Sequence, residues 1–207
     1  MAEPGLRDRK KARTRRLIAD TAARLFAERG YERVTVSEIA RAAEVAEQTL
    51  YNYFPTKEHL VTDREQQIQQ QLGDLIRARP AGTSPAAAIR DFVLHTVAAI
   101  GDMPPELGRG SLGYLAAISP AVKRLALELT DRQARALAAA ISDTTPVAPE
   151  IARLQGIALA GVFQIIITEA GRRTREGQSQ DQIADELRPA IEADLDDLDR
   201  WLTPATK

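Results

Sequence analysis

Residues 34–57 constrain the fold more than any other stretch, because they combine two short helical patterns with a turn and a stop signal. Ser37 is a suitable N-cap for a first helix that runs to about Ala43. A second helix is predicted from Glu47, and it ends at Pro55 because the residue before a proline disfavours helix. Two helices joined by a tight turn, the second polar on its outer face, are typical of the helix-turn-helix motif, whose second helix lies in the DNA major groove.

The outer face of the predicted second helix carries side chains that suit base recognition. Gln48 and Asn52 lie four residues apart on this face, and their carboxamides can pair with adenine. Glu47 is repelled by phosphate unless it accepts a hydrogen bond from cytosine N4, so it either tunes specificity or points away. The hydroxyls of Thr35 and Ser37 lie where a helix N-terminus can receive a phosphate. A merely solvated polar face is the alternative interpretation.

The charge of the chain is distributed unevenly. Its net charge of −1 combines +3 over residues 1–60 with −4 over the remainder. Seven of the cations lie between Arg7 and Arg16, where Asp8 alone opposes them. Such a run can be a solvated, disordered tail, but directly before a helix-turn-helix it is predicted to contact DNA phosphates or a minor groove, with Arg13 among the contacts. The acidic remainder repels DNA and confines binding to one end of the molecule.

A longer resemblance surrounds this motif. The residues that carry it are Ile18 to Tyr31, Thr35-Val36, Glu38-Ile39-Ala40, Ala43, Val45, Thr49-Leu50-Tyr51, Tyr53-Phe54-Pro55 and Lys57-Glu58. In this order and spacing they closely resemble the N-terminal domain of TetR-type (tetracycline-repressor-like) transcriptional regulators, over roughly the first third of the chain. Two positions depart from the family pattern. Glu44 stands where the family usually has a turn glycine, and Ala46 replaces the usual capping serine or threonine.

The resemblance implies an all-α protein in two parts. An N-terminal arm and three-helix helix-turn-helix domain are expected at residues 1–56, and a C-terminal helical regulatory and dimerisation domain at residues 57–207. The implied partners are double-stranded operator DNA and a second copy of the chain. Four residues match family positions that contact phosphates: Thr49, Tyr51, Tyr53 and Lys57. For Tyr51, a half-buried position is the alternative.

Apolar residues at helical spacing predict helices along the rest of the chain, and strand patterning is essentially absent. The predicted ranges are 13–29, 57–78, 84–100, 120–142, 150–175 and 179–202. Residues 106–118, which contain Gly108, Gly110 and Gly113, are predicted to be irregular because glycine weakens helix interiors. We expect this segment to be loose enough to rearrange.

Catalysis finds little support in this sequence. The chain has no cysteine, and its two histidines, His59 and His95, fall in different predicted domains. The spacings Glu-x-x-His and His-Glu-x-x-His are absent, so a helical metal site is disfavoured, and neither a cofactor nor a metal is predicted. A helical-bundle enzyme is the rival interpretation. The basic N-terminus and the lack of an apolar run near ~18 residues predict a cytoplasmic protein that does not span a membrane.

The predicted helix 150–175 is apolar around most of its circumference, so several of its sides must be covered. Gly156, Ala160 and Gly161 would allow another helix to approach closely. The resemblance implies that the last two helices form a four-helix bundle with a symmetry mate, to which Leu195 and Leu198 contribute. A buried helix in a monomer is the alternative.

The resemblance also implies a small-molecule cavity in the centre of the C-terminal domain. The residues expected to line it are Phe92, His95, Thr96, Met103, Tyr114, Phe163, Gln164 and Thr168. Because aromatic residues make up only 4% of the chain, the cavity is expected to be aliphatic and lightly polar, which favours a small and mainly apolar effector. His95 either contacts the effector or is a satisfied core residue.

The resulting functional prediction is a homodimeric regulator that releases its operator when the effector binds, most simply a repressor. The predicted helix 57–78 would transmit this signal, because it starts at Lys57 beside the DNA and continues into the C-terminal core. The alternatives are a helical-bundle enzyme and a DNA-binding protein that responds to no effector.

Overall fold

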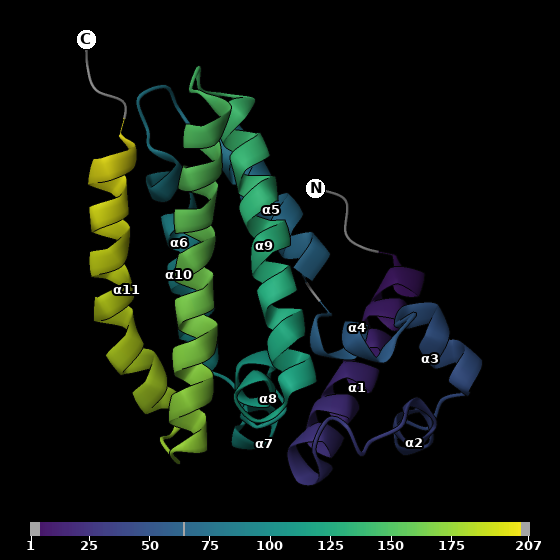
Figure 1. Cartoon of the computed structure of the whole chain (residues 1–207). Coiled ribbons are helices and arrows are strands. Elements are labelled where there is room, and N and C mark those ends of the chain that lie inside the picture. Colours follow the sequence, from purple (N-terminus) through teal and green to yellow (C-terminus); the bar gives the residue numbers. More distant parts are fainter. Residues whose placement is uncertain (1–4, 64, 204–207) are drawn as a thin grey trace.

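The computed structural model describes residues 5–63 and 65–203, and within these ranges it contains helices and no strand. The prediction of an all-α protein is confirmed. The helices are α1 (Leu6–Arg29), α2 (Val36–Ala42), α3 (Glu47–Tyr53), α4 (Lys57–Val61), α5 (Glu65–Ala78), α6 (Pro85–Gly101), α7 (Pro105–Gly108), α8 (Leu112–Ile118), α9 (Pro120–Ser142), α10 (Pro149–Arg175) and α11 (Gln180–Leu202). In Figure 1, α1 to α4 form a small body beside a bundle of long, nearly upright helices that includes α9, α10 and α11.

The small body is built around one face of α1. Ile18, Ala22 and Phe26, which lie four residues apart, are at most 1% exposed. Ile39 of α2 and Leu50 of α3 are fully buried in the same core. The short helices α2 and α3 therefore owe their stability to packing against α1, because isolated helices of this length are not stable in water.

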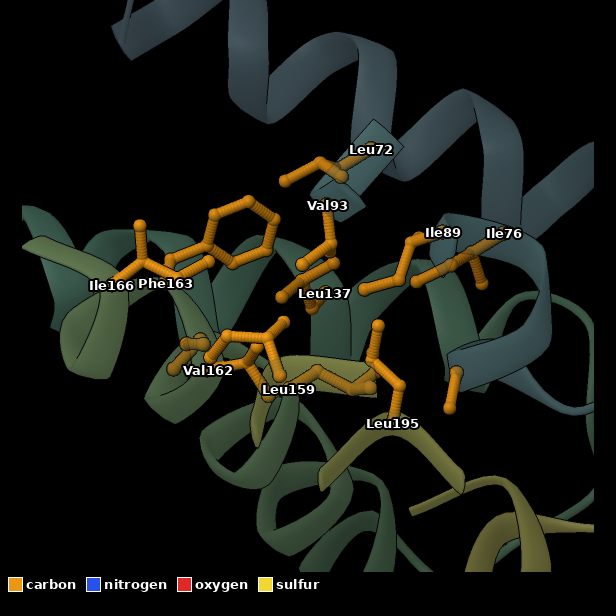
Figure 2. Packing of buried hydrophobic residues seen from close by; sticks show 14 of the residues in the cluster. Leu72, Ile76, Ile89, Val93, Leu137, Leu159, Val162, Phe163, Ile166 and Leu195 are labelled. Carbon is orange, nitrogen blue, oxygen red and sulfur yellow. The ribbon is translucent and has the colours of Figure 1, made fainter. Parts of the chain in front are cut away.

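The bundle has a second core, to which all its long helices contribute (Figure 2). Its labelled side chains come from each of them: Leu72 and Ile76 from α5, Ile89 and Val93 from α6, Leu137 from α9, Leu159, Val162, Phe163 and Ile166 from α10, and Leu195 from α11. Complete burial of one such side chain stabilises the fold by about 1.5–3 kcal/mol. This core fixes the bundle as a rigid support for the small body.

Contacts cross the boundary expected at residue 56. The core of the small body continues into Leu60 of α4, Leu115 of α8 and Val122 of α9, all of them buried. The hydroxyl of Ser119, between α8 and α9, also donates a hydrogen bond to a carboxylate oxygen of Glu32. The two bodies therefore share a packed junction.

The segment expected to be irregular and loose is ordered instead. It forms α7 and α8. Its glycines allow the backbone of this segment to pack closely against neighbouring helices instead of making the segment mobile. A Cβ at Gly110 would lie 2.1 Å from the Ala23 carbonyl oxygen of α1, and one at Gly113 would lie 2.3 Å from the Ile167 carbonyl oxygen of α10. The prediction failed because glycine weakens helices but also permits the closest helix contacts.

Two helix boundaries also differ from the predictions. The helix expected over 57–78 is divided, since α4 ends at Val61 and α5 begins at Glu65. A single rigid rod from Lys57 into the bundle is therefore wrong. At the other end, α1 begins at Leu6 rather than near Arg13, so the basic run is helical and not an extended tail.

The expectation that no apolar run could span a membrane is also corrected. Helix α10 is long and apolar enough for this by length and composition, although these properties are shared by core helices of soluble proteins. Within the described chain α10 packs against α9, α11 and α8, and its buried residues belong to the bundle core. We therefore interpret it as a core helix with one uncovered side.

Candidate nucleic-acid interface

Helix α2 is capped two residues earlier than the sequence predicts, and its N-terminus is a capping box. Thr35, and not Ser37, is the N-cap: its hydroxyl oxygen accepts a hydrogen bond from the Glu38 backbone N–H, at 3.2 Å. In return, the Glu38 carboxylate accepts a hydrogen bond from the Thr35 backbone N–H, at 2.8 Å. This bond, together with a 2.5 Å ion pair to Arg29, lowers the Glu38 carboxyl pKa to about 2. The ion pair ties the start of α2 to the end of α1.

The turn between α2 and α3 explains both departures from the family pattern. Glu44 adopts a φ of 54°, the left-handed conformation that favours glycine. The Val45 backbone N–H donates to the Ala40 carbonyl and closes the turn at 3.0 Å. Ala46 is the N-cap of α3 and makes no side-chain hydrogen bond there. The turn is formed without the usual glycine and without the usual capping hydroxyl.

Helix α3 turns its polar side outward, as the sequence predicts. Leu50 is fully buried, as is Phe54 just beyond the helix, whereas Gln48 and Asn52 are exposed. The Gln48 amide donates to the Asn52 side-chain oxygen at 3.3 Å. The remaining candidate contacts on this helix are exposed (Glu47 and Tyr51) or partly exposed (Thr49 and Tyr53). Their contacts with DNA stay predictions.

Lys57 is directed into the small body. Its ammonium group donates to the Tyr31 carbonyl oxygen and lies 4.2 Å from the centroid of the Tyr31 ring. Partial burial lowers the Lys57 pKa. The hydroxyl of Tyr31 in turn donates to Glu58, at 3.3 Å. Lys57 thus fastens the start of α4 to the segment between α1 and α2, a role that its position beside the motif did not reveal.

Arg15 joins three parts of the small body, a role that its place within a run of similar cations does not reveal. Its guanidinium forms an ion pair with Asp63, at 2.5 Å, and donates to the Tyr53 carbonyl oxygen, at 3.2 Å. It also lies 4.7 Å from the centroid of the Phe54 ring. These contacts hold the end of α3 against α1. Arg13, the predicted phosphate contact, is exposed on the same helix.

The residues expected to line an effector cavity do not converge on one place. Phe92 and Phe163 pack together in the bundle core, with ring centroids 6.2 Å apart. His95 and Thr168 are exposed, which corrects their assignment to a buried cavity. Tyr114 packs against the core of the small body.

The remaining cavity candidates make contacts within the helices or lie at partly exposed positions. The Thr96 hydroxyl donates to the Phe92 carbonyl at 2.9 Å, and the Gln164 carbonyl accepts the Thr168 hydroxyl at 2.8 Å. Met103 and Gln164 themselves are partly exposed. A groove of about 460 Å³ lies elsewhere, along α5, lined by Gln67, Gln70, Gln71, Asp74, Leu75 and Ala78.

The residues predicted for a dimer interface lie on different sides of the bundle. A Cβ at Gly156 would lie 2.4 Å from the Ala134 carbonyl oxygen of α9, and Ala160 is fully buried, so both face their own chain. This corrects their assignment. Leu195 is likewise fully buried in the bundle core, while Leu198 is partly exposed beside it.

One side of α10 is uncovered. Among the residues that the structure describes, Gly161 has no neighbour within 4 Å of an added Cβ. Around it, α10 presents four large apolar side chains that are 43–51% exposed, and Trp201 of α11 is exposed to a similar degree: Ile151, Leu154, Ile157, Ile165 and Trp201. We call this set the α10–α11 apolar face.

Comparison with known sequences finds relatives among bacterial regulators. Residues 18–63 match the family described as bacterial regulatory proteins, tetR family. The transcriptional regulator TcmR of Streptomyces glaucescens is 30% identical over 151 residues, which are 73% of this chain and 62% of TcmR. The nucleoid occlusion factor SlmA of Haemophilus ducreyi is 29% identical over 117 residues, or 55% of this chain and 58% of SlmA. The chain thus spans about three fifths of the length of these relatives.

Comparison with solved structures finds the same fold. NalD, described as the secondary repressor of the MexAB-OprM multidrug efflux pump in Pseudomonas aeruginosa, is 20% identical with a TM-score of 0.56. The match covers 88% of this chain and 97% of NalD. A transcriptional regulator from Aquifex aeolicus is 17% identical with a TM-score of 0.50, covering 87% of this chain and 98% of that one.

Proposed function

The chain belongs to the tetR family of bacterial regulatory proteins, and on that premise we propose that it is a sequence-specific DNA-binding regulator that acts as a repressor. The observation that carries this proposal is α3, a helix held by its buried Leu50 while Gln48 and Asn52 face outward. Carboxamides at these positions can read adenine in the major groove. Cytoplasmic location follows from a role on DNA.

The decisive experiment begins with duplexes of random sequence, because the operator is unidentified. Repeated rounds of binding to the full chain enrich preferred sequences, which are then compared with scrambled duplexes in a titration. We expect an enriched, pseudo-palindromic sequence that binds at least 10³-fold more tightly than the scrambled duplex, as specific regulators do. Failure to enrich any sequence would refute specific recognition.

We propose further that the functional unit is a homodimer formed through the α10–α11 apolar face. Scattered single apolar side chains on a surface are ordinary, but a continuous exposed row on one helix marks an interaction site. A two-fold symmetric pairing of this face with itself would cover both copies at once. The pairing would also set the distance between the two copies of α3, and hence the spacing of the operator half-sites.

The proposed effector site involves fewer residues than the sequence predicts. We infer that an apolar effector would enter the bundle beside Phe92 and Phe163, which are the predicted lining residues that pack together. Accommodating it requires these rings to separate, so the effector must bind a conformation different from the packed one. A DNA-binding protein without an effector is the alternative. Calorimetry distinguishes the effector-responsive protein from one that binds no effector. Apolar candidate ligands are titrated into free protein and into DNA-bound protein. Because the two binding sites are thermodynamically linked, an inducer must bind the DNA-bound form less tightly than the free form.

We retain the boundary at residue 56 as a proposed division between DNA-binding and regulatory parts. The junction of α7 and α8 with both bodies supports a coupled pair rather than independent domains. Enzymatic activity stays the rival to this whole proposal, and it predicts turnover by the purified protein without enrichment of any DNA sequence.

A further inference from the structure

Helix α9, all of which the structure describes, buries one polar side chain within an otherwise apolar face. This face begins at Val122, in the core of the small body, and continues to Leu137, in the bundle core. Gln133 lies between them at helical spacing, is 5% exposed and is followed directly by Ala134 of the bundle core. A glutamine buried to this degree is uncommon unless its amide is hydrogen-bonded.

The amide of Gln133 has no hydrogen-bond partner among the residues that the structure describes. Another buried glutamine, Gln180 at the start of α11, is 7% exposed and donates to the Thr174 hydroxyl at 3.2 Å. The Gln133 amide is also reachable, because the completely enclosed unpaired atom of the described chain belongs to Gln178 instead. An unpaired amide in apolar surroundings lowers stability, so packing alone does not explain Gln133.

Gln133 lies at the end of the core that contains Phe163. Leu137, about one turn further along α9, belongs to this core together with Phe163 (Figure 2). Helices α9 and α10 run in opposite directions (Figure 1), and a Cβ at Gly156 of α10 would lie 2.4 Å from the Ala134 carbonyl oxygen. Phe163 follows Gly156 by about 10 Å along α10, and therefore lies on the Gln133 side of this contact. The amide thus faces the region where the rings would separate.

We propose that Gln133 determines ligand specificity in the bundle, and that it selects an uncharged, mainly apolar molecule carrying a carboxamide-like group. This inference rests on the proposed effector and names its polar part. A group that both donates and accepts complements the Gln133 amide, which offers N–H donors and a carbonyl acceptor. A charged ligand is disfavoured, because the buried polar side chains of the described residues are threonine, serine and glutamine, and none of them carries a charge to pair with it.

The first test needs no ligand and compares two buried glutamines of the full chain. Gln133→Met replaces the amide by an apolar side chain of similar length, and it should raise the midpoint of urea unfolding because no hydrogen bond is lost. Gln180→Met is the matched control and should lower the midpoint, since the Thr174 hydroxyl loses its partner. If Gln133→Met is less stable than the wild type, the amide serves the fold and the proposal is overturned.

The second test titrates three probes that share one apolar chain: decanamide, N,N-dimethyldecanamide, which has no N–H donor, and the anion decanoate. The wild type should bind decanamide more tightly than either of the others by about tenfold, which corresponds to one additional hydrogen bond. In Gln133→Met, decanamide and its dimethyl derivative should bind equally, whereas Gln180→Met should keep the wild-type preference. A wild type that binds decanamide no more tightly than decanoate would contradict the proposal, as would a Gln133→Met variant that keeps the preference.

The failure of this inference differs from the failure of the proposed function. If the wild type enriches a duplex but shows no preference for decanamide, the role of Gln133 is wrong while the DNA-binding function stands. If the wild type enriches no duplex but prefers decanamide, and Gln133→Met loses that preference, the DNA-binding function fails and the ligand specificity of Gln133 is supported.

Discussion

Gly110 lies directly against Ala23, so that a Cβ at position 110 would come within 2.1 Å of the Ala23 carbonyl oxygen. The contact joins the segment before α8 to α1, the central helix of the small body. On its other side, Gly113 meets Ile167 of α10 equally closely. A shift of α10 would therefore displace α1 through backbone contacts that no side chain can cushion, and these contacts link the bundle to the small body.

Gly110→Ala should loosen this link. The added methyl group must push α1 and the α7–α8 segment apart, which we expect to destabilise the protein by about 1–3 kcal/mol. Urea unfolding measures the effect. Gly73→Ala is the control, because its Cβ would meet the flexible end of Arg77 and helix propensity favours alanine by about 1 kcal/mol. Equal stability of the two variants would contradict the rigid contact.

Gln48→Ala and Asn52→Ala should each relax base preference. If either carboxamide pairs bidentately with adenine, its loss should reduce discrimination at one base pair by about 1–3 kcal/mol. Binding to scrambled duplexes should change little, since both side chains are exposed and the fold does not depend on them. Repeating the enrichment with each variant measures its base preference. If both variants keep the base preference of the wild type, Gln48 and Asn52 do not recognise bases.

Lys57→Ala should affect stability as well as DNA affinity. The ammonium group contacts the Tyr31 carbonyl and ring, and a cation–π contact of this kind contributes about 0.5–2 kcal/mol. We expect a lower midpoint of unfolding and weaker binding to every duplex alike. Lys57→Arg, which keeps the charge and can still lie over the ring, should recover much of the stability. A variant that loses affinity without any loss of stability would mean that Lys57 turns outward to phosphate.

Leu154→Asp should separate the dimer. Leu154 is 50% exposed on the α10–α11 apolar face, and burying a leucine stabilises an interface by about 1.5–3 kcal/mol. Leu127→Asp provides a matched control, because Leu127 is also 50% exposed but lies on α9. Sedimentation should show monomers for the first variant and dimers for the second. A wild-type protein that is monomeric at micromolar concentration would refute the interface.

Glu38 should make the stability of the small body sensitive to acid. Hydrogen bonds from Thr35 and the ion pair with Arg29 lower its carboxyl pKa from the ordinary 4.5 to about 2. The unfolded chain therefore binds the proton more readily, so this stabilisation is complete above pH 4.5 and is lost as the pH falls toward about 2. In Glu38→Gln, the free energy of unfolding should vary less across this window. Identical pH profiles of the wild type and the variant would contradict the capping box.

The local sequence determined much of this protein. Periodic apolar residues fixed the long helices α6, α9, α10 and α11 to within a few residues, since a helix must bury such a stripe. The pattern from Ile18 to Lys57 identified the helix-turn-helix and its outward-facing Gln48 and Asn52. Pro55 stopped α3 as expected, because proline acts on the residue next to it. These features depend on neighbours in the chain.

Tertiary contacts decided the rest. Thr35 is the cap because Glu38 follows it at the local spacing of a capping box, and the fold adds the ion pair of Glu38 with Arg29 of another helix. Gly110 and Gly113 suggest a loose segment by propensity, yet packing against α1 and α10 made them the tightest points of the junction. Lys57 and Arg15 carry a charge that suits DNA, but distant partners, Tyr31 and Asp63, direct them inward. The spacing of residues along a helix predicts which of them share a face. What that face contacts depends on the packed chain, because such contacts join residues far apart in the sequence.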